Sequence, residues 1–464
     1  MEHVDESAPR SPYKLLSGPL LGAATAGWAH LAGLDSAIVS TLFVTVWVAA
    51  WWVSAAIPHA FTSLLPLGLL PMLGILSGKQ VAEAYGNPLI LLLAGGFMMA
   101  SALEKNGAHR RLALGMLHLV GSGSGRALVW GFALATGLCS MWISNTATTL
   151  MMVPVAIAIL EAYPDRRLAV PLLLAIGYCA SVGGLGTPVG SPPNLVFMQV
   201  YAQTTGQSLG FSDWLWFGLP TVALLLPLIA WWLSRGLADT PPATLPAQGH
   251  WQPAERRVLL VFGLVALAWV TRSEPFGGWS RLFGLPGASD ASVALLGAVL
   301  MALVPSGRGG PLLDWKTAER IPWSALILFG GGIALATAFE SSGLSALIAQ
   351  ALQGLITLPL LLQVALIAAS VTLLSEIASN TATAVLLMPL LAAAAQAAGV
   401  DPALLMVPAV LAASCGFMLP VATAPNAIVF GTPYIEARDM LRHGLAVDLF
   451  CVAGITLVCG VLLR

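Results

Sequence analysis

The chain has 464 residues, of which 58% are hydrophobic and 9% are charged, with a formal net charge of −1. Soluble domains carry about 25% charged residues, so this composition excludes a soluble fold and indicates an all-α polytopic membrane protein. The near-neutral charge gives no reason to expect a nucleic-acid partner. The five cysteines lie in apolar segments without CxxC spacing, which predicts small core residues rather than disulfides or metal ligands.

Uncharged stretches recur along the chain, and many are as long as the roughly 20 residues that a membrane-spanning helix needs. Residues 36–58 and 214–234, for example, contain no Asp, Glu, Lys or Arg. A Pro-rich polar linker at 237–255, expected to be cytoplasmic, separates two halves. In chain order we predict helices near 16–34, 36–58, 61–77, 87–104, 168–203, 214–235, 256–271, 289–306, 321–340, 402–434 and 444–463.

Two further uncharged or nearly uncharged runs, 127–160 and 341–400, are too long for simple spans. The first has 34 residues, and a straight helix of that length would measure about 51 Å, against a hydrocarbon core of about 30 Å. Each run contains the sequence Ser-Asn-Thr-Ala-Thr, at 144–148 and at 379–383. We therefore predict two re-entrant helical hairpins with this motif at the tip, where Ser is also a good helix N-cap.

Charge placement supports this topology. With a cytoplasmic N-terminus and both hairpins re-entrant, sixteen of the 20 Lys and Arg residues fall on the cytoplasmic side. The first hairpin then enters from the cytoplasm and the second from outside. Glycines and a glutamate at 95–107 are repeated at 331–343, so the halves form an inverted repeat of the kind that secondary transporters use. We expect a multi-pass protein of the bacterial plasma membrane.

Four interruptions of the helices carry the predicted chemistry: the two hairpin tips and two Gly/Pro-rich breaks, at 183–194 and 419–426. Proline removes a backbone donor and frees carbonyl oxygens, which together with Ser, Thr and Asn oxygens suit an alkali cation. The N-termini of half-helices suit carboxylates. No Lys, Arg or His lies near these interruptions in the sequence. A bound cation would supply the missing positive charge for an anion, although the same absence also fits a neutral substrate.

The paired Ser-Asn-Thr motifs, with Gly-Thr-Pro…Pro-Pro-Asn at 186–194 and Thr-Ala-Pro-Asn at 423–426, resemble those of the divalent anion/Na⁺ symporter family over nearly the whole chain. The resemblance implies eleven spanning helices plus two hairpins, a homodimer and an elevator mechanism. It implies scaffold helices in 1–125 and 256–345, and the two halves of a transport domain in 126–236 and 346–464. Ala424 departs from the family pattern, which often has a second proline at this position.

The resemblance also implies site residues. It assigns one Na⁺ site to Ser140, Ser144, Asn145 and Gly186, and the other to Ser375, Ala378, Asn380 and Ala422. It assigns the substrate carboxylates to Asn145, Thr146, Thr187, Asn380, Thr381 and Thr423.

The sequence therefore predicts Na⁺-coupled import of a small dicarboxylate of the succinate, malate and fumarate class, with no enzymatic activity. A Na⁺-independent dicarboxylate exchanger, a tricarboxylate or sulfate symporter, and an ion channel are the alternatives. If the motifs have only a structural role, they form hydrogen bonds between packed helices, and the breaks are then kinks for helix packing. Glu376, beside the second motif, is either a proton or cation site or a hydrogen-bonding partner within the hairpin.

Overall fold

The computed structural model describes residues 12–120, 124–162, 166–237, 249–272, 278–348 and 358–463. Within these ranges every regular element is a helix, and the only extended pairing is an isolated bridge between Pro305 and Pro311. Seven of the described helices are long and apolar enough to cross a membrane, by length and composition, and further apolar helices are shorter. The prediction of an all-α membrane protein is confirmed.

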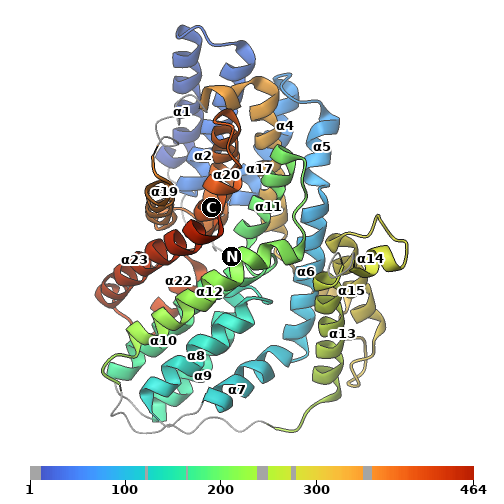
Figure 1. Ribbon diagram of the computed structural model, residues 1–464, viewed down its shortest axis with the longest axis vertical. Coiled ribbons are helices and arrows are strands. Elements are labelled where there is room, and N and C mark those ends of the chain that lie inside the picture. Colours follow the sequence, from blue (N-terminus) through green and yellow to red (C-terminus); the bar gives the residue numbers. More distant parts are fainter. Residues whose placement is uncertain are drawn as a thin grey trace.

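The first helices of the chain, α1, α2 and α4, lie at one end of the elongated molecule, and α6 runs from there along its side towards the other end (Figure 1). α1 and α2 pack closely because Gly18 and Gly22 lie against the Trp47, Trp51 and Phe43 residues of α2. The chain then turns through short helices before α6, which begins with Pro88 at its first turn under the Asn87 cap. The helices are α1 (Pro12–Leu31), α2 (Ser36–Ser54), α3 (His59–Thr62), α4 (Leu64–Met72), α5 (Gly78–Tyr85), α6 (Pro88–Lys105) and α7 (Ala108–Val120).

The first long uncharged run folds as a helical hairpin, as predicted. Its two helices meet at a short turn that ends at Ser144, and the following helix is interrupted at the first Gly/Pro-rich break. α8, α9 and α10 lie together at the opposite end of the molecule from α2 and α4 (Figure 1). The elements are α8 (Gly125–Ser140), α9 (Asn145–Ala162), α10 (Arg166–Gly183), the 3₁₀ turn η1 (Gly184–Gly186), α11 (Pro192–Thr205) and α12 (Phe211–Leu233).

The second half repeats this order. Its first helix begins at Pro253, three residues before the predicted start at 256. The second hairpin and second broken helix follow, and a final helix of 26 residues ends the chain. The elements are α13 (Pro253–Val270), α14 (Gly278–Leu282), α15 (Asp290–Leu303), α16 (Trp315–Ala318), α17 (Trp323–Ser342), α19 (Leu360–Ser375), α20 (Asn380–Ala397), α21 (Ala403–Ala413), α22 (Ala424–Phe430) and α23 (Ala437–Leu462).

Packing of small residues shows the internal repeat in three dimensions. Gly95 on α6 lies against Ala294 of α15, and its counterpart Gly331 on α17 lies against Ser63 at the end of α3. Helices in a membrane approach closely through such small residues. Gly107 and Gly343, which follow α6 and α17, both adopt left-handed backbone, with φ of +76° and +80°. The two equivalent helices are therefore packed and terminated in the same way.

Several predicted boundaries were wrong in detail. The helix predicted near 61–77 is divided into α3 and α4, because the chain turns at Ser63. The last helix starts at Ala437 rather than near 444, since a capping box of Glu436 and Asp439 starts it earlier. The predicted linker loses its last residues to α13, and 238–248 lie outside the described residues, as do 349–357 of the second run.

Candidate functional site

The tip of the first hairpin is built by Ser144 and Asn145. The Ser144 hydroxyl accepts the backbone N–H of Ala147 at 3.2 Å, so it caps α9 as the sequence predicted. Such a cap contributes about 1 kcal/mol to the start of a helix. Beneath the tip, the Ser140 hydroxyl lies 2.7 Å from the side-chain amide of Asn145 and donates to the Ala180 carbonyl at 2.7 Å. The tip is thereby fixed to the last turn of α10.

The tip of the second hairpin repeats these contacts. Ser379 accepts the N–H of Ala382 at 3.3 Å and caps α20. The Ser375 hydroxyl lies 2.9 Å from Asn380 Oδ1 and donates to the Ala413 carbonyl at 2.6 Å, in the last turn of α21. Ser140 and Ser375 are both fully buried. Because hydrogen-bond partners match at every step, the duplicated motif is a duplicated structure and not only a duplicated sequence.

The two breaks are closed by equivalent asparagines. Asn194 Nδ2 donates to the carbonyls of Gly184 and Thr187, at 2.9 and 2.8 Å. Asn426 Nδ2 donates to the carbonyls of Gly416 and Leu419, at 3.0 and 3.1 Å. In both loops the acceptors lie ten and seven residues before the asparagine. These clamps satisfy carbonyls that the broken helix leaves free, which lipid could not do.

The structure brings the four interruptions together. A methyl group placed on Gly184 would lie 2.5 Å from Asn145 Oδ1, so the first tip rests directly on the first break. Gly416 lies in the same way close to the Ser375 carbonyl. The hairpin helix of each half also packs on the broken helix of the other half: α9 packs on α22, and α20 packs on α11. Ser191 Oγ of the first break lies 3.4 Å from Oγ of Ser414, which ends α21 shortly before the second break.

The predicted site residues all lie at or beneath the two tips or in the two breaks, with different exposure. Side chains at the tips are half-buried and reachable, whereas those beneath them are buried. The half-buried residues are Ser144, Asn145, Thr146, Asn380 and Thr381, and the buried ones are Ser140, Gly186, Thr187, Ser375, Ala378, Ala422 and Thr423. The assignments of these residues to Na⁺ and to the substrate carboxylates stay predictions.

The clamp geometry identifies two residues that the sequence interpretation missed. Matching Asn194 to Asn426 aligns the breaks with an offset of 232 residues, the difference between those two numbers. On this alignment Ala422 and Thr423 correspond to Gly190 and Ser191. The predicted Gly186 and Thr187 correspond instead to Met418 and Leu419. The matching sequences Ser-Pro-Pro-Asn at 191–194 and Thr-Ala-Pro-Asn at 423–426 carried this signal.

Thr187 is occupied by contacts within the protein. Its hydroxyl donates to the Met141 carbonyl and accepts the Gly190 N–H at 3.2 Å. It is 1% exposed. Thr187 therefore joins the first break to the first tip. Ser191 Oγ, in contrast, makes only the 3.4 Å contact with Ser414 among the hydrogen bonds of the described residues.

The donor set suits Na⁺. Among the described residues no group of three or more His, Cys, Asp or Glu side chains could hold a metal ion. The atoms gathered at the centre are backbone carbonyls, hydroxyls and amide oxygens, the neutral hard donors that alkali cations accept. Several buried oxygens there have no hydrogen-bond partner in the described structure: Thr148 Oγ1, Thr383 Oγ1, Asn194 Oδ1 and Asn426 Oδ1. Buried polar atoms normally have partners, so these oxygens are available to a ligand.

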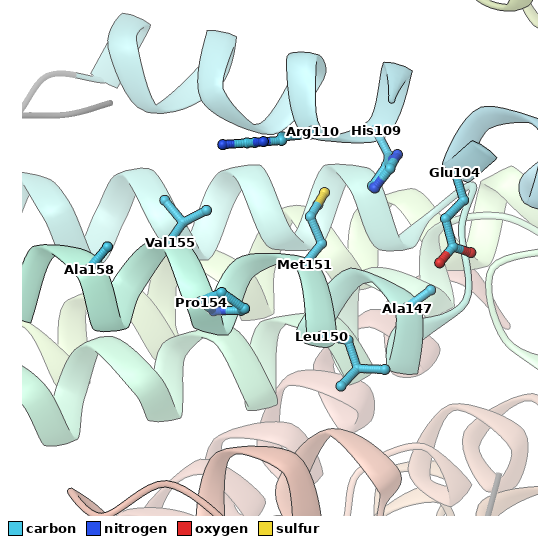
Figure 2. Close-up of a pocket in the computed structure, with 9 residues that line it drawn as sticks. All are labelled: Glu104, His109, Arg110, Ala147, Leu150, Met151, Pro154, Val155 and Ala158. Atoms are coloured by element: carbon cyan, nitrogen blue, oxygen red, sulfur yellow. The ribbon is translucent and has the colours of Figure 1, made fainter. Parts of the chain in front are cut away.

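A cavity of about 450 Å³ lies beside the first hairpin, between α7 and α9 (Figure 2). Ala147, next to the tip residue Thr146, lies at one end of its lining. Figure 2 shows Arg110 and His109 of α7 facing the apolar side chains of α9. Burial lowers the pKa of His109, which keeps its imidazole neutral near pH 7 and leaves Arg110 as the fixed positive charge on this wall.

A family model described as "Citrate transporter" (CitMHS) matches residues 47–407. The sodium-dependent dicarboxylate transporter SdcS of Staphylococcus saprophyticus is 38% identical over 96% of this chain and 90% of its own length. The protein of the same name from Staphylococcus aureus NCTC 8325 is 37% identical, over 96% of this chain and 89% of its own. The chain belongs to the divalent anion/Na⁺ symporter family.

The fold has a more distant likeness as well. The YdaH transporter of Alcanivorax borkumensis, whose crystal structure is described as having an unusual topology, shares the fold with a TM-score of 0.59 and 16% identity. The likeness covers 83% of this chain and 87% of that one. As a member of the divalent anion/Na⁺ symporter family the protein is a multi-pass membrane transporter and not an enzyme.

Proposed function

We propose that the protein couples Na⁺ entry to the import of a small dicarboxylate of the succinate, malate and fumarate class. The observation that carries the proposal is the duplicated tip-and-break network, which concentrates neutral oxygen donors at one place and, within the described residues, has no cationic side chain among its hydrogen-bonding partners. A dianion bound there needs positive charge, and bound Na⁺ supplies it. The names of the two staphylococcal relatives support Na⁺ and a dicarboxylate as the pair of substrates.

We assign the two Na⁺ sites to the two tip-and-break units. The first comprises Ser140, Ser144 and Asn145 with the carbonyl of the first break, and the repeat favours Gly190 over Gly186 for that carbonyl. The second comprises Ser375, Ala378, Asn380 and Ala422. The carboxylates of the substrate would meet Asn145, Thr146, Asn380, Thr381 and Thr423, with Ser191 as the counterpart of Thr423 in the first half.

Uptake into proteoliposomes tests this function. Radiolabelled succinate is expected to accumulate when an inward Na⁺ gradient is imposed, and not when the gradient is K⁺, since both staphylococcal relatives are named as sodium-dependent. Internal unlabelled succinate should accelerate entry by exchange but should not be required. Uptake that depends on internal dicarboxylate and ignores Na⁺ would establish the exchanger instead, and faster uptake of citrate or sulfate would correct the substrate class.

We also propose that the domains 126–236 and 346–464 move as one body against the scaffold 1–125 and 256–345. Such a motion must break contacts between the two bodies. Gly96 of α6 faces Val189 in the first break, and Gly332 of α17 faces Val385 of α20. The equivalent glycines of the two scaffold halves thus each contact a transport half, one at the first break and the other at the second hairpin.

A disulfide across the first of these contacts is expected to stop transport. A Cβ atom on Gly96 would lie 3.8 Å from Val189 Cβ, which matches the mean separation of about 3.8 Å in disulfides. Oxidation of the Gly96→Cys, Val189→Cys double variant should abolish uptake, and reduction should restore it. Each single variant is the control, and the native cysteines of the described structure are all buried. A cross-linked protein that still transports at the rate of the reduced form would refute relative movement at this contact.

We further propose that the protein is a homodimer in the membrane. α13 and α15 carry exposed apolar side chains at helical spacing, which form a face for a second copy or for lipid. They are Leu260, Leu264, Leu267, Leu296, Val299 and Leu303.

A further inference from the structure

A buried ion pair lies where α12, α13 and α15 meet. Asp290, the first residue of α15, is 8% exposed, and its Oδ1 accepts a hydrogen bond from Arg272 Nε at 2.5 Å. Its Oδ2 accepts the backbone N–H of Phe211, the first residue of α12, at 3.0 Å. The first N–H groups of a helix have no partner within the helix, and a carboxylate stabilises them. Asp290 therefore fixes the start of α12 against α15, while Arg272 compensates its charge.

Three aromatic rings stack beside this ion pair. The Phe211 ring is stacked with that of Trp269 in α13, with the ring centroids 5.1 Å apart and the planes at 13°. It is also stacked with the ring of Trp142, at 5.9 Å and 15°. Trp269 is 1% exposed and donates its indole N–H to the backbone carbonyl of Asp290 at 3.0 Å. Phe211 is thus held twice, through its backbone by the carboxylate and through its ring by Trp269.

Trp142 belongs to the first hairpin tip. It lies in the turn after α8, two residues before the capping Ser144. Besides stacking with Phe211, its ring makes an edge-on contact with Phe262 of α13, with a centroid distance of 5.4 Å and an angle of 89° between the planes. Both partners lie outside the hairpin. The turn that carries Ser144 and Asn145 is therefore supported by residues of α12 and α13.

The second tip has no equivalent stack. Matching Ser144 to Ser379, with an offset of 235 residues as the difference between those two numbers, places Ile377 at the position of Trp142. Ile377 has no aromatic ring and is 62% exposed, whereas Trp142 is half-buried. The two tips share their hydrogen bonds, so the stack is not a requirement of the hairpin itself. It is a feature of the first tip alone.

We propose that Asp290 and Arg272 are positioning residues for the first Na⁺ site. They hold Phe211, and the aromatic stack holds Trp142 and with it the turn at Ser144, so the tip keeps its binding geometry when no ion is bound. Preorganised groups bind a ligand more tightly because the free energy of ordering them is not lost on binding. The consequence for Na⁺ rests on the proposed function, whereas the support of the tip does not.

Hydrogen exchange measured by mass spectrometry tests the support of the tip without a transport assay. The two tips offer equivalent amides, since the N–H groups of Thr148 and Thr383 donate to the carbonyls of the capping serines at 3.0 and 2.9 Å. In Asp290→Asn the segment 142–148 should exchange about 2- to 12-fold faster than in the wild type, the range that one aromatic stacking contact is worth. The segment 377–383 should exchange at its wild-type rate.

Two further variants make this result specific. Phe211→Leu keeps the ion pair and removes the ring, so it should loosen the first tip even if Asp290→Asn does not fold. Glu255→Gln is the matched control, because Glu255 also pairs with an arginine, Arg111 at 3.0 Å, and also accepts a backbone N–H at a helix start, that of Gln252 at 2.8 Å. It should leave both tips unchanged. A wild-type exchange rate at the first tip of Phe211→Leu, or an equal rise at both tips, would overturn the proposal.

The Na⁺ dependence of uptake tests the effect on ion binding. The Na⁺ concentration for half-maximal uptake should rise by about 2- to 12-fold in Asp290→Asn and Phe211→Leu and stay unchanged in Glu255→Gln. A role in stability alone would lower the maximal rate and leave this concentration unchanged, which would refute the positioning role. Absence of Na⁺-dependent succinate uptake in the wild type would refute the proposed function instead, while the exchange result would still decide whether the stack supports the tip.

Discussion

Replacement of Asn145 or Asn380 by alanine is expected to abolish Na⁺-dependent uptake while the protein still folds. Each amide stands at a half-buried hairpin tip, in contact with the buried Ser140 or Ser375 hydroxyl at 2.7 and 2.9 Å. Each is assigned to both a Na⁺ ion and a carboxylate. Loss of one hydrogen bond to a charged group costs about 1.5–3 kcal/mol, and two such losses at one tip amount to at least about a 100-fold decrease in uptake at subsaturating substrate.

Asn106→Ala is the matched control for these variants. Asn106 is a buried asparagine with two hydrogen bonds, to the carbonyls of Ala102 and Leu312 at 2.7 and 2.8 Å. It lies at the end of α6, remote in sequence from both tips, so its loss should lower stability more than transport. Initial uptake rates together with elution from a size-exclusion column separate the two effects. Normal Na⁺-dependent uptake in both tip variants would remove Asn145 and Asn380 from the site.

The sequence predicted the architecture of the site well because length and polarity are strong constraints in a membrane. A 34-residue uncharged run that cannot span straight must fold back, and a polar cluster in its middle must be the turn. Proline and glycine then locate the breaks. The N-cap roles of Ser144 and Ser379 followed from local chemistry alone and are confirmed. These features depend on short segments, so no tertiary contact was needed to predict them.

The register of the first break was harder to predict. Gly-Thr-Pro at 186–188 and Gly-Ser-Pro at 190–192 are alike, and sequence alone does not tell which one faces the tip. The distinction depends on Asn194, whose amide closes the loop at Gly184 and Thr187. The register is fixed by the hydrogen bond from Asn194 to the carbonyl of Gly184, ten residues earlier, which exists only in the folded loop.

A buried acid in the last helix was missed for a similar reason. Sequence analysis singled out Glu376, and Asp448 of α23 is just as buried. The two halves also differ here. The equivalent of Glu376 in the first hairpin is Met141, whose backbone carbonyl accepts the Thr187 hydroxyl. In the second half the side chain of Glu376 binds the loop of the break, whereas in the first half the backbone carbonyl of Met141 binds it through the Thr187 hydroxyl. Comparison of the two repeat sequences does not reveal this difference.

Gly186 and Gly190 are the two candidates for the Na⁺-binding carbonyl of the first break, and a large effect of mutation is expected at Gly190. Gly190→Ala should impair Na⁺-dependent uptake severely, because its Cβ would lie 2.6 Å from the Gly184 carbonyl oxygen and 2.9 Å from that of Met141. Both are backbone atoms, so the break and the tip must separate. Overpacking of this kind costs about 1–3 kcal/mol. If that cost appears in the Na⁺-bound geometry, the apparent Na⁺ affinity should fall by about 5- to 150-fold.

Gly186→Ala is the matched variant for this experiment. The three atoms nearest to its Cβ would all belong to the side chain of Met141, with Cε at 2.8 Å, and a side chain can shift more easily than backbone. Most of the Na⁺ affinity should therefore remain. The repeat gives a further reason to expect the contrast: Ala422, the counterpart of Gly190, already carries a methyl group, so the second loop leaves room for one where the first does not. Measured Na⁺ affinities in the reverse order would return the first Na⁺ site to Gly186 and would mean that the two breaks bind their ions in different registers.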